Sequence, residues 1–150
     1  MDYCLRRANK EDTNFLYELR NDELTRAMSI NSDLVQYEDH IAWLEKTLGS
    51  AEVNLYILKR TDIDQRCGMG RVEHEDSNTL LLSWAIAPKF RGRGLASLII
   101  KELIALREAK YCAYIKPDNL PSIKAAEKVG FVFKEINYTN NLGRYELNSY

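Results

Sequence analysis

The sequence is poor in the residues that cross-link small folds or bind metals, with three cysteines and two histidines among 150 residues. Cys4, Cys67 and Cys112 stand alone in different predicted strands, without Cys-x-x-Cys spacing, and two scattered histidines cannot complete a zinc set. We therefore expect no metal site and no disulfide. All three cysteines are predicted to be buried, reduced thiols.

The sequence also lacks an excess of charge of either sign, since 21 Lys and Arg residues face 22 Asp and Glu residues. This balance argues against a nucleic-acid partner, and any anion site must be local. There is no signal peptide, basic tail or apolar run long enough to cross a bilayer. We expect a cytoplasmic protein without a membrane partner, as a monomer or a homodimer.

Length and hydrophobic patterning predict a single domain over residues 1–150. Alternating or continuous apolar runs predict strands at 3–7, 54–59, 66–74, 79–87, 111–115, 131–137 and 144–147. Helical periodicity predicts four helices, through Phe15 and Leu19, over 37–48, over 95–110 and from about 121 to 129. The fold class is therefore mixed α/β (α+β), with an antiparallel meander followed by a parallel strand at 111–115.

A polar segment between the first two helices, residues 20–35, shows no sustained periodicity. A connector this long in a compact domain is usually functional or mobile. Its functional candidates are Arg20, Asn21, Arg26 and Met28, although Arg20 and Asn21 are equally well explained as solvated residues at a helix end.

The most informative stretch is Arg91-Gly92-Arg93-Gly94-Leu95-Ala96, which follows a predicted strand and opens a predicted helix. Two glycines allow a tight turn with unobstructed amides, and the first N–H groups of the helix lack carbonyl partners. This arrangement favours a bound phosphate, and most of all a diphosphate.

A second motif begins at Asn119 and runs through Ser122 to Lys128-Val129-Gly130-Phe131. Pro121 suits the first helical turn, and Gly130 suits a helix end. By itself this segment is an ordinary capped helix followed by a strand.

Together the two motifs resemble those of the GNAT superfamily of N-acetyltransferases. In that family the coenzyme A loop reads [QR]-x-x-G-x-[GA], and the next helix carries N-x-x-S/A and ends in K-x-G-F. The matching residues are Arg91, Gly94, Ala96, Asn119, Ser122, Lys128, Gly130 and Phe131. The resemblance extends over nearly the whole chain and implies a mostly antiparallel sheet of six or seven strands, with a central parallel pair splayed at the coenzyme site.

The resemblance implies acetyl-CoA as co-substrate and assigns its contacts. The loop amides of Arg91, Gly92, Arg93, Gly94, Leu95 and Ala96 would hold the pyrophosphate, and the backbone of Trp84, Ala85 and Ile86 would bind pantetheine and the thioester oxygen. The Asn119 side chain would contact the pantetheine arm. The region of Arg20, Asn21, Arg26 and Met28 would shape the acceptor site.

The proton carriers are not given by motif, because the tyrosine that many relatives place four residues before the helix-terminal glycine is Ala126 here. Candidates for the base are Glu73 and His74, and candidates for protonating the thiolate are Tyr114 and Tyr138. Ser83 could equally hold a catalytic water. A low-pKa primary amine would need the least help, since neutralising an α-amine at pH 7 costs about 1–1.5 kcal/mol against about 4–5 for a lysine-like amine.

The acceptor is predicted from a narrower resemblance of residues 19–28 and 40–44 to two subgroups. One acetylates nucleotide-linked amino sugars and the other acetylates protein N-termini, notably of ribosomal proteins. We favour the sugar amine. A non-catalytic acyl-CoA-binding module remains an alternative. A dinucleotide-binding oxidoreductase is disfavoured because Ser97 breaks the third glycine of the Gly92-x-Gly94-x-x-Gly fingerprint.

Overall fold

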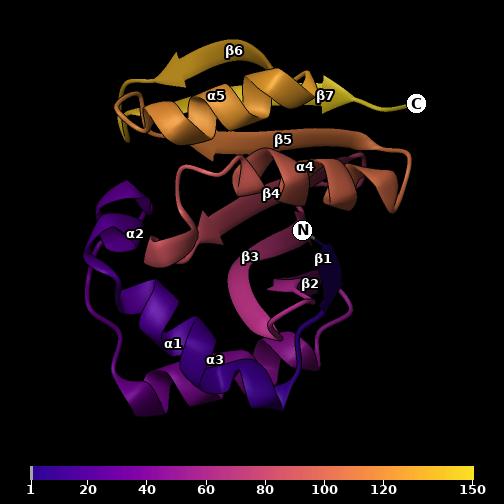
Figure 1. Ribbon diagram of the computed structural model, residues 1–150. Coiled ribbons are helices and arrows are strands. Elements are labelled where there is room, and N and C mark those ends of the chain that lie inside the picture. Colours follow the sequence, from indigo (N-terminus) through magenta and orange to yellow (C-terminus); the bar gives the residue numbers. More distant parts are fainter. Residues whose placement is uncertain (1) are drawn as a thin grey trace.

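The computed structural model describes residues 2–150 and contains a seven-stranded sheet in the order β1-β2-β3-β4-β5-β7-β6 (Figure 1). The strands are β1 (Tyr3–Arg7), β2 (Val53–Arg60), β3 (Gln65–His74), β4 (Thr79–Ile86), β5 (Lys110–Ile115), β6 (Val132–Asn137) and β7 (Leu142–Asn148). All neighbouring strands are antiparallel except β4 and β5, which are parallel. The predicted fold class is confirmed.

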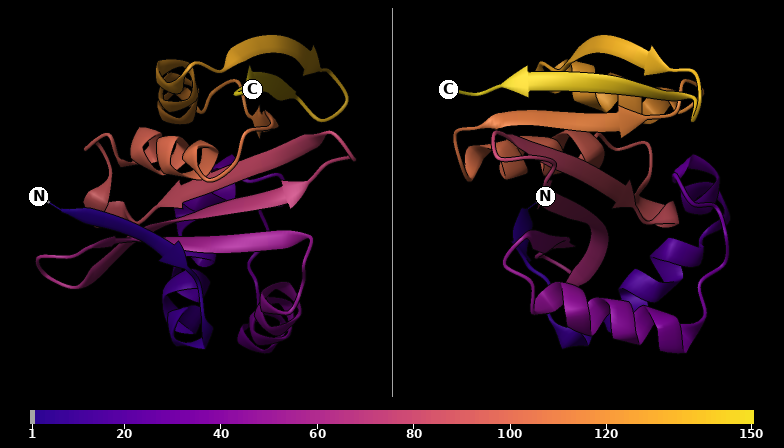
Figure 2. Two further views of the ribbon diagram at one scale, coloured as in Figure 1. Left: turned by 90° about the vertical axis from the view of Figure 1, so that its right-hand side faces the viewer. Right: turned by 180° about the vertical axis from the view of Figure 1, so that it is seen from behind.

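Five α-helices connect and cover the sheet: α1 (Thr13–Asn21), α2 (Glu23–Met28), α3 (Tyr37–Leu48), α4 (Leu95–Ala105) and α5 (Leu120–Val129). Figure 2 shows α1 and α3 on one face of the sheet and α4 and α5 on the other. Two short 3-10 turns, Lys10–Asp12 and Pro88–Phe90, precede α1 and the glycine turn. The sequence predicted four helices, and α2 is the additional one.

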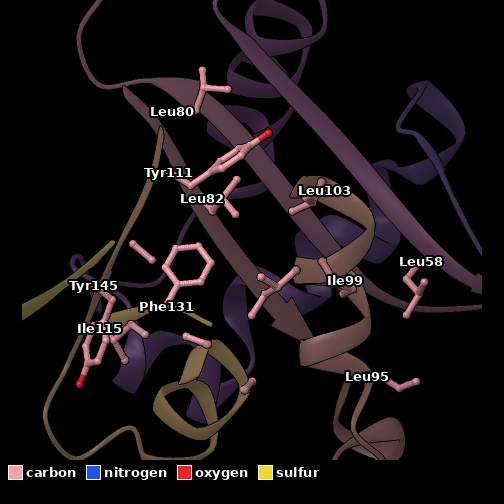
Figure 3. Close-up of a cluster of buried hydrophobic side chains, with 14 of the residues drawn as sticks. Leu58, Leu80, Leu82, Leu95, Ile99, Leu103, Tyr111, Ile115, Phe131 and Tyr145 are labelled. Carbon is pink, nitrogen blue, oxygen red and sulfur yellow. The ribbon is translucent and has the colours of Figure 1, made fainter. Parts of the chain in front are cut away.

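The larger core lies between the sheet and the pair α4 and α5 (Figure 3). Ile99 and Leu103 recur on one side of α4 and pack against Leu80 and Leu82 of β4. Close contact with β3 depends on Gly70, where an added Cβ would lie 2.9 Å from both Ile99 and Leu103. The side of β3 that carries Gly70 therefore faces α4.

A smaller core lies on the opposite face, where Leu16 of α1 and Leu44 of α3 pack against Leu55 and Ile57 of β2. It is fastened to the sheet by Asp12, whose fully buried carboxylate accepts hydrogen bonds of 2.7–2.8 Å from Arg6 on β1 and Arg66 on β3. Although burial by itself raises the pKa of Asp12, these guanidinium groups hold it at about 2.

Two details of the sequence prediction are wrong. The helix predicted to reach Lys110 ends at Ala105, because the Leu106 N–H bonds to Leu103 O in a tighter turn, and Leu106 is exposed. Cys4 is exposed rather than buried, while Cys67 and Cys112 are buried as predicted. On edge strand β1 the neighbours Tyr3 and Leu5 pack on the core, so the pleat turns Cys4 to the other face.

Candidate active site

The parallel strands β4 and β5 pair at one end and separate toward the other. Their ladder covers Thr79 to Leu81 on β4, and beyond Leu81 that edge of β4 has no strand partner among residues 2–150. A cleft of about 970 Å³ opens there. This volume is at the upper end of the range of small-molecule sites in proteins.

The cleft extends through the gap from one face of the sheet to the other. Because side chains alternate along a strand, Met69 and Arg71 lie on the face opposite Gly70, toward α1 and α3. Trp84 lies on the α5 side, where its indole Nε1 donates to Ser122 Oγ at 3.2 Å. All three line the cleft. We call the walls formed by β4, the turn 91–97 and α5 the loop half, and the walls formed by α1, α2, α3 and β3 the arginine half.

The loop half centres on the glycine turn before α4. Gly92 and Gly94 both adopt a left-handed backbone with φ of 76°, and a Cβ at either position would meet nothing within 4 Å. Gly94 is also the N-cap of α4 and provides no capping side chain. The first N–H groups of α4 and the positive end of its dipole are therefore presented beside an open glycine turn, which is the geometry of an anion site.

Besides the backbone amide that the sequence prediction assigned to the pyrophosphate, Arg91 has a side chain that joins two walls of the cleft. Its guanidinium donates to Asp22 Oδ2 at 2.5 Å and to Ile86 O at 3.1 Å. Asp22 lies between α1 and α2, where it also caps α2 by accepting from Thr25 N at 3.0 Å. Arg91 therefore ties the glycine turn to the arginine half. Arg93 is exposed and lies over the Phe90 ring.

The α5 wall adds residues that the sequence reasoning partly missed. Asn119 lines the cleft and caps α5, its Oδ1 accepting from Ser122 N. Lys124 and Lys128, one helical turn apart, also line the cleft. Lys128 was recognised as a motif residue but was given no role in the site, and Lys124 was not singled out, because lysines on a short helix are ordinarily solvated. Their i, i+4 spacing on the helix of the second motif was the available signal.

The arginine half is built around Arg20 of α1. Its guanidinium carbon lies 4.3 Å from the centre of the Trp43 ring, and its Nη1 lies 3.1 Å from His40 Nδ1. The other ring nitrogen of His40 lies 3.0 Å from Thr13 O, so Nε2 carries the proton and Nδ1 accepts from Arg20. Burial lowers the pKa of His40, and the charge of Arg20 lowers it further, so the imidazole is neutral at pH 7.

Of the four predicted acceptor-side residues, Arg20 and Met28 line the cleft. Asn21 instead bridges to the backbone of Val35 through two hydrogen bonds of 2.8 and 2.9 Å. Arg26 donates to Asn21 O and Ser32 O. These two residues fix the connector between α2 and α3 and are not among the lining residues. Trp43, which lies in the segment 40–44 that was likened to the substrate half of two subgroups, also lines the cleft, and so does Arg71, which was not predicted.

The four candidate proton carriers, Glu73, His74, Tyr114 and Tyr138, lie outside the cleft lining. Glu73 accepts from Arg71 Nη2 at 3.1 Å. Tyr114 donates to Glu75 Oε2 at 2.6 Å and also contacts Arg144. Burial and this hydrogen bond raise the pKa of Tyr114 to about 12. Their catalytic roles remain predictions, whereas Ser83 lines the cleft on the same side of the sheet as Arg71.

The predicted coenzyme contacts converge on the loop half. Trp84, Ala85, Ile86, Gly92, Gly94, Leu95, Ala96 and Asn119 all line it. The open glycine turn and the uncapped start of α4 fit a diphosphate, and the unpaired edge of β4 offers backbone groups to an amide-containing chain. The residues present therefore fit coenzyme A.

Comparison with protein families gives a direct match. The model of the acetyltransferase (GNAT) domain matches residues 2–132 of this chain. A search of curated proteins finds no match.

Solved structures show the same fold at low sequence identity. A spermidine N-acetyltransferase from Vibrio cholerae, in complex with CoA and spermine, superposes with a TM-score of 0.85 at 15% identity, covering 98% of this chain and 95% of that one. An N-acetyltransferase from Staphylococcus aureus Mu50 gives a TM-score of 0.80 at 21% identity, with full coverage of both chains. An aminoglycoside acetyltransferase in complex with coenzyme A gives 0.80 at 17% identity and covers 98% and 95%. The chain belongs to the GNAT acetyltransferase family and is an acetyl-CoA-dependent N-acetyltransferase.

Proposed function

We propose that this N-acetyltransferase, acting as one domain over residues 1–150, acetylates the primary amine of a small molecule, specifically a nucleotide-linked amino sugar. The observation that carries the proposal is the cleft through the gap between β4 and β5. It allows acetyl-CoA held in the loop half to meet an amine that enters from the arginine half. Acetyl-CoA supplies an activated acyl thioester, and the protein must position an uncharged amine against it.

The residues of the loop half have roles in binding and charge stabilisation. The amides of the glycine turn and the start of α4 would bind the pyrophosphate, with Lys124 and Lys128 adding positive charge. The free backbone edge of β4 near Ala85 and Ile86 would hold pantetheine and donate to the thioester oxygen as negative charge develops there.

The arginine half favours a weakly basic amine. The buried imidazole of His40 already uses both ring nitrogens in hydrogen bonds, and Glu73 is paired with Arg71. We therefore assign proton removal to a water molecule that the Ser83 hydroxyl would bind, since Ser83 lines the cleft. The positive charges of Arg20 and Arg71 would lower the pKa of a nearby ammonium group and so favour the neutral nucleophile.

The same charges argue against a polyamine acceptor. Of the charged residues that line the arginine half, Arg20 and Arg71 are basic and the exposed Asp33 is acidic. Spermidine and aminoglycosides, the acceptors named for two of the structural neighbours, are polycations. This cleft would repel them rather than neutralise them.

The first test is a calorimetric titration with acetyl-CoA, with NAD as the control ligand. Thiol release is then followed with a nucleotide-linked amino sugar, a peptide with a free N-terminus, and spermidine. We expect acetyl-CoA binding and turnover of the amino sugar. Turnover of the peptide alone would favour protein N-terminal acetylation, binding without turnover of any amine would favour a coenzyme-binding module, and rapid turnover of spermidine would contradict the charge argument.

A further inference from the structure

Two arginines face the same part of the cleft from opposite walls. Arg20 projects from α1 and Arg71 from β3, and both line the arginine half. Both guanidinium groups belong to the arginine half of the cleft, where burial lowers the pKa of Arg20 and the positive charge of Arg71 lowers it further. Like charges brought together without a shared counter-ion are ordinarily unfavourable.

Most of their hydrogen-bonding capacity is unused. A guanidinium has five N–H donors. Within residues 2–150, Arg20 makes one hydrogen bond, to neutral His40, and Arg71 makes one, to Glu73. The Arg71 Nε is buried and has no hydrogen-bond partner among the described residues. Elsewhere the Arg71 side chain is 30% exposed and lines the cleft, so its remaining N–H donors can reach an acceptor that the chain itself does not provide.

The local charges do not cancel. Glu73 offsets one of the two arginines, and His40 contributes no charge at pH 7 because its pKa is lowered by burial. Asp33, on the connector between α2 and α3, is the lining carboxylate on this side, but it is exposed, and no salt bridge joins it to either arginine. The wall formed by Arg20, Arg71 and Glu73 therefore keeps one positive charge.

Both arginines are held in place before any ligand arrives. Arg20 lies on the Trp43 ring and against the buried His40, and Arg71 is fixed by Glu73 and by the β3 backbone. Pre-positioned guanidinium groups lose less conformational entropy on binding and match the planar geometry of oxyanions. Structural stability alone does not account for two half-satisfied arginines in an open cleft.

We propose that Arg20 and Arg71 bind an oxyanion of the acceptor molecule, at a position away from its amine. The inference rests on the proposed function for the amine but names a separate property, a carboxylate or phosphate on the same molecule. The pair holds this anion while the free amine points through the gap toward β4. Phosphate would belong to a nucleotide-linked or phosphorylated amine, and carboxylate to an amino acid.

The test measures anion binding directly. Protein saturated with coenzyme A, so that the loop half is occupied, is titrated with inorganic pyrophosphate and separately with malonate. We expect one of the two to bind, pyrophosphate indicating a phosphate acceptor and malonate a carboxylate acceptor. The variant Arg71→Gln should weaken this binding by about 10- to 100-fold. The variant Arg71→Lys keeps the positive charge but loses the planar guanidinium with its paired donors. Its anion affinity should lie between those of the unaltered protein and Arg71→Gln.

Lys101→Gln is the matched control, because it removes one positive charge from the exposed side of α4, outside the cleft lining. It should leave anion binding unchanged. Failure of both anions to bind the coenzyme complex, or equal binding by Arg71→Gln and the unaltered protein, would overturn the inference.

Kinetics provide the second arm. With a phosphorylated and an unphosphorylated form of one amino sugar, Arg71→Gln should raise KM more for the phosphorylated form than for the unphosphorylated form and leave coenzyme affinity unchanged. An equal rise for both forms would contradict anion recognition. Failure of acetyl-CoA to bind at all would instead refute the proposed function, and comparing anion binding by the unaltered protein and by Arg71→Gln, both without coenzyme, would still decide the anion site.

Discussion

The two halves of the cleft are built from different parts of the polypeptide. The loop half depends mainly on backbone: two glycines with positive φ, the uncapped start of α4 and the unpaired edge of β4. The arginine half depends on side chains, with Arg20, Trp43 and Arg71 supplied by α1, α3 and β3. A site made of backbone needs a fixed local conformation, whereas a site made of side chains needs only that distant elements meet.

The largest effect is expected where the arginine half is fastened to the sheet. Asp12→Asn removes the buried charge that binds Arg6 and Arg66, and should lower the free energy of unfolding by about 3 kcal/mol, the low end for a broken buried pair because both arginines keep some contact with water. Urea unfolding at pH 7 measures this loss. Asp62→Asn is the control, because it breaks an exposed pair with Arg60 and should have no measurable effect.

Asp12→Asn also tests how the stability of the protein depends on acidic pH. A carboxyl whose pKa is held at about 2 adds stability above the unfolded value of about 3.8, and this contribution disappears as the pH falls from 3.8 toward 2. Unfolding midpoints of Asp12→Asn should lack that part of the acid loss. An identical acid profile for both proteins would show that other groups determine it.

Gly94→Glu attacks the loop half. The side chain would enter the open turn, strain a backbone at φ of 76° and place negative charge where the pyrophosphate is expected. Acetyl-CoA affinity should fall about 100-fold by calorimetry. Gly94→Gln introduces a side chain of nearly the same size as Gly94→Glu but without the charge, so it should lose less affinity for acetyl-CoA. Coenzyme affinity unchanged in both variants would contradict a backbone site.

Arg91→Gln tests whether the two halves are separable. Because Arg91 bonds to Asp22 and Ile86 O, its loss should disturb the α1–α2 junction and raise the acceptor KM about tenfold. Coenzyme affinity should change less. Lys101→Gln, at an exposed position on α4 outside the cleft lining, should change neither value. A larger effect on the coenzyme than on the acceptor would restore the role that the sequence motif suggested for Arg91.

The smallest effect concerns His40. Its pKa is lowered on folding, so the unfolded chain binds more protons below pH 6.5 and stability falls as the pH drops through that value. The loss between pH 7.5 and 5.5 should be no more than about 1.4 kcal/mol, the limit for one group that binds no proton in the folded state. In chemical denaturation, His40→Gln should remove this dependence of the free energy of unfolding on pH. The substitution can also lower stability by an amount that is the same at every pH. A slope that persists would assign the pH dependence to another group.

The success of the sequence analysis follows this division between the halves. Strand β1 at Tyr3–Arg7 and helix α3 at Tyr37–Leu48 agree with the predicted ranges, because each has strong local patterning. The glycine turn was found because its backbone conformation requires glycine at fixed spacing.

Other features have no local signature. Helix α2 has six residues, too few to establish a period, although Asp22 before Glu23 was a capping signal that could have revealed it. Arg71 lies in a strand like any other polar residue, and nothing near it in the chain shows that it faces Arg20. Contacts between residues about 50 or 70 positions apart, such as Arg91 with Asp22, arise from the folded topology alone.

The short ladder between β4 and β5 has an evolutionary consequence. After Leu81 the two strands share no backbone pairing, so mutations that widen, narrow or reline the gap break no sheet hydrogen bond. Natural selection can therefore vary the recipient of the acetyl group while the donor machinery is inherited unchanged. The range of acceptors that such a scaffold can acquire therefore depends on the part of the sheet where β4 and β5 are not paired.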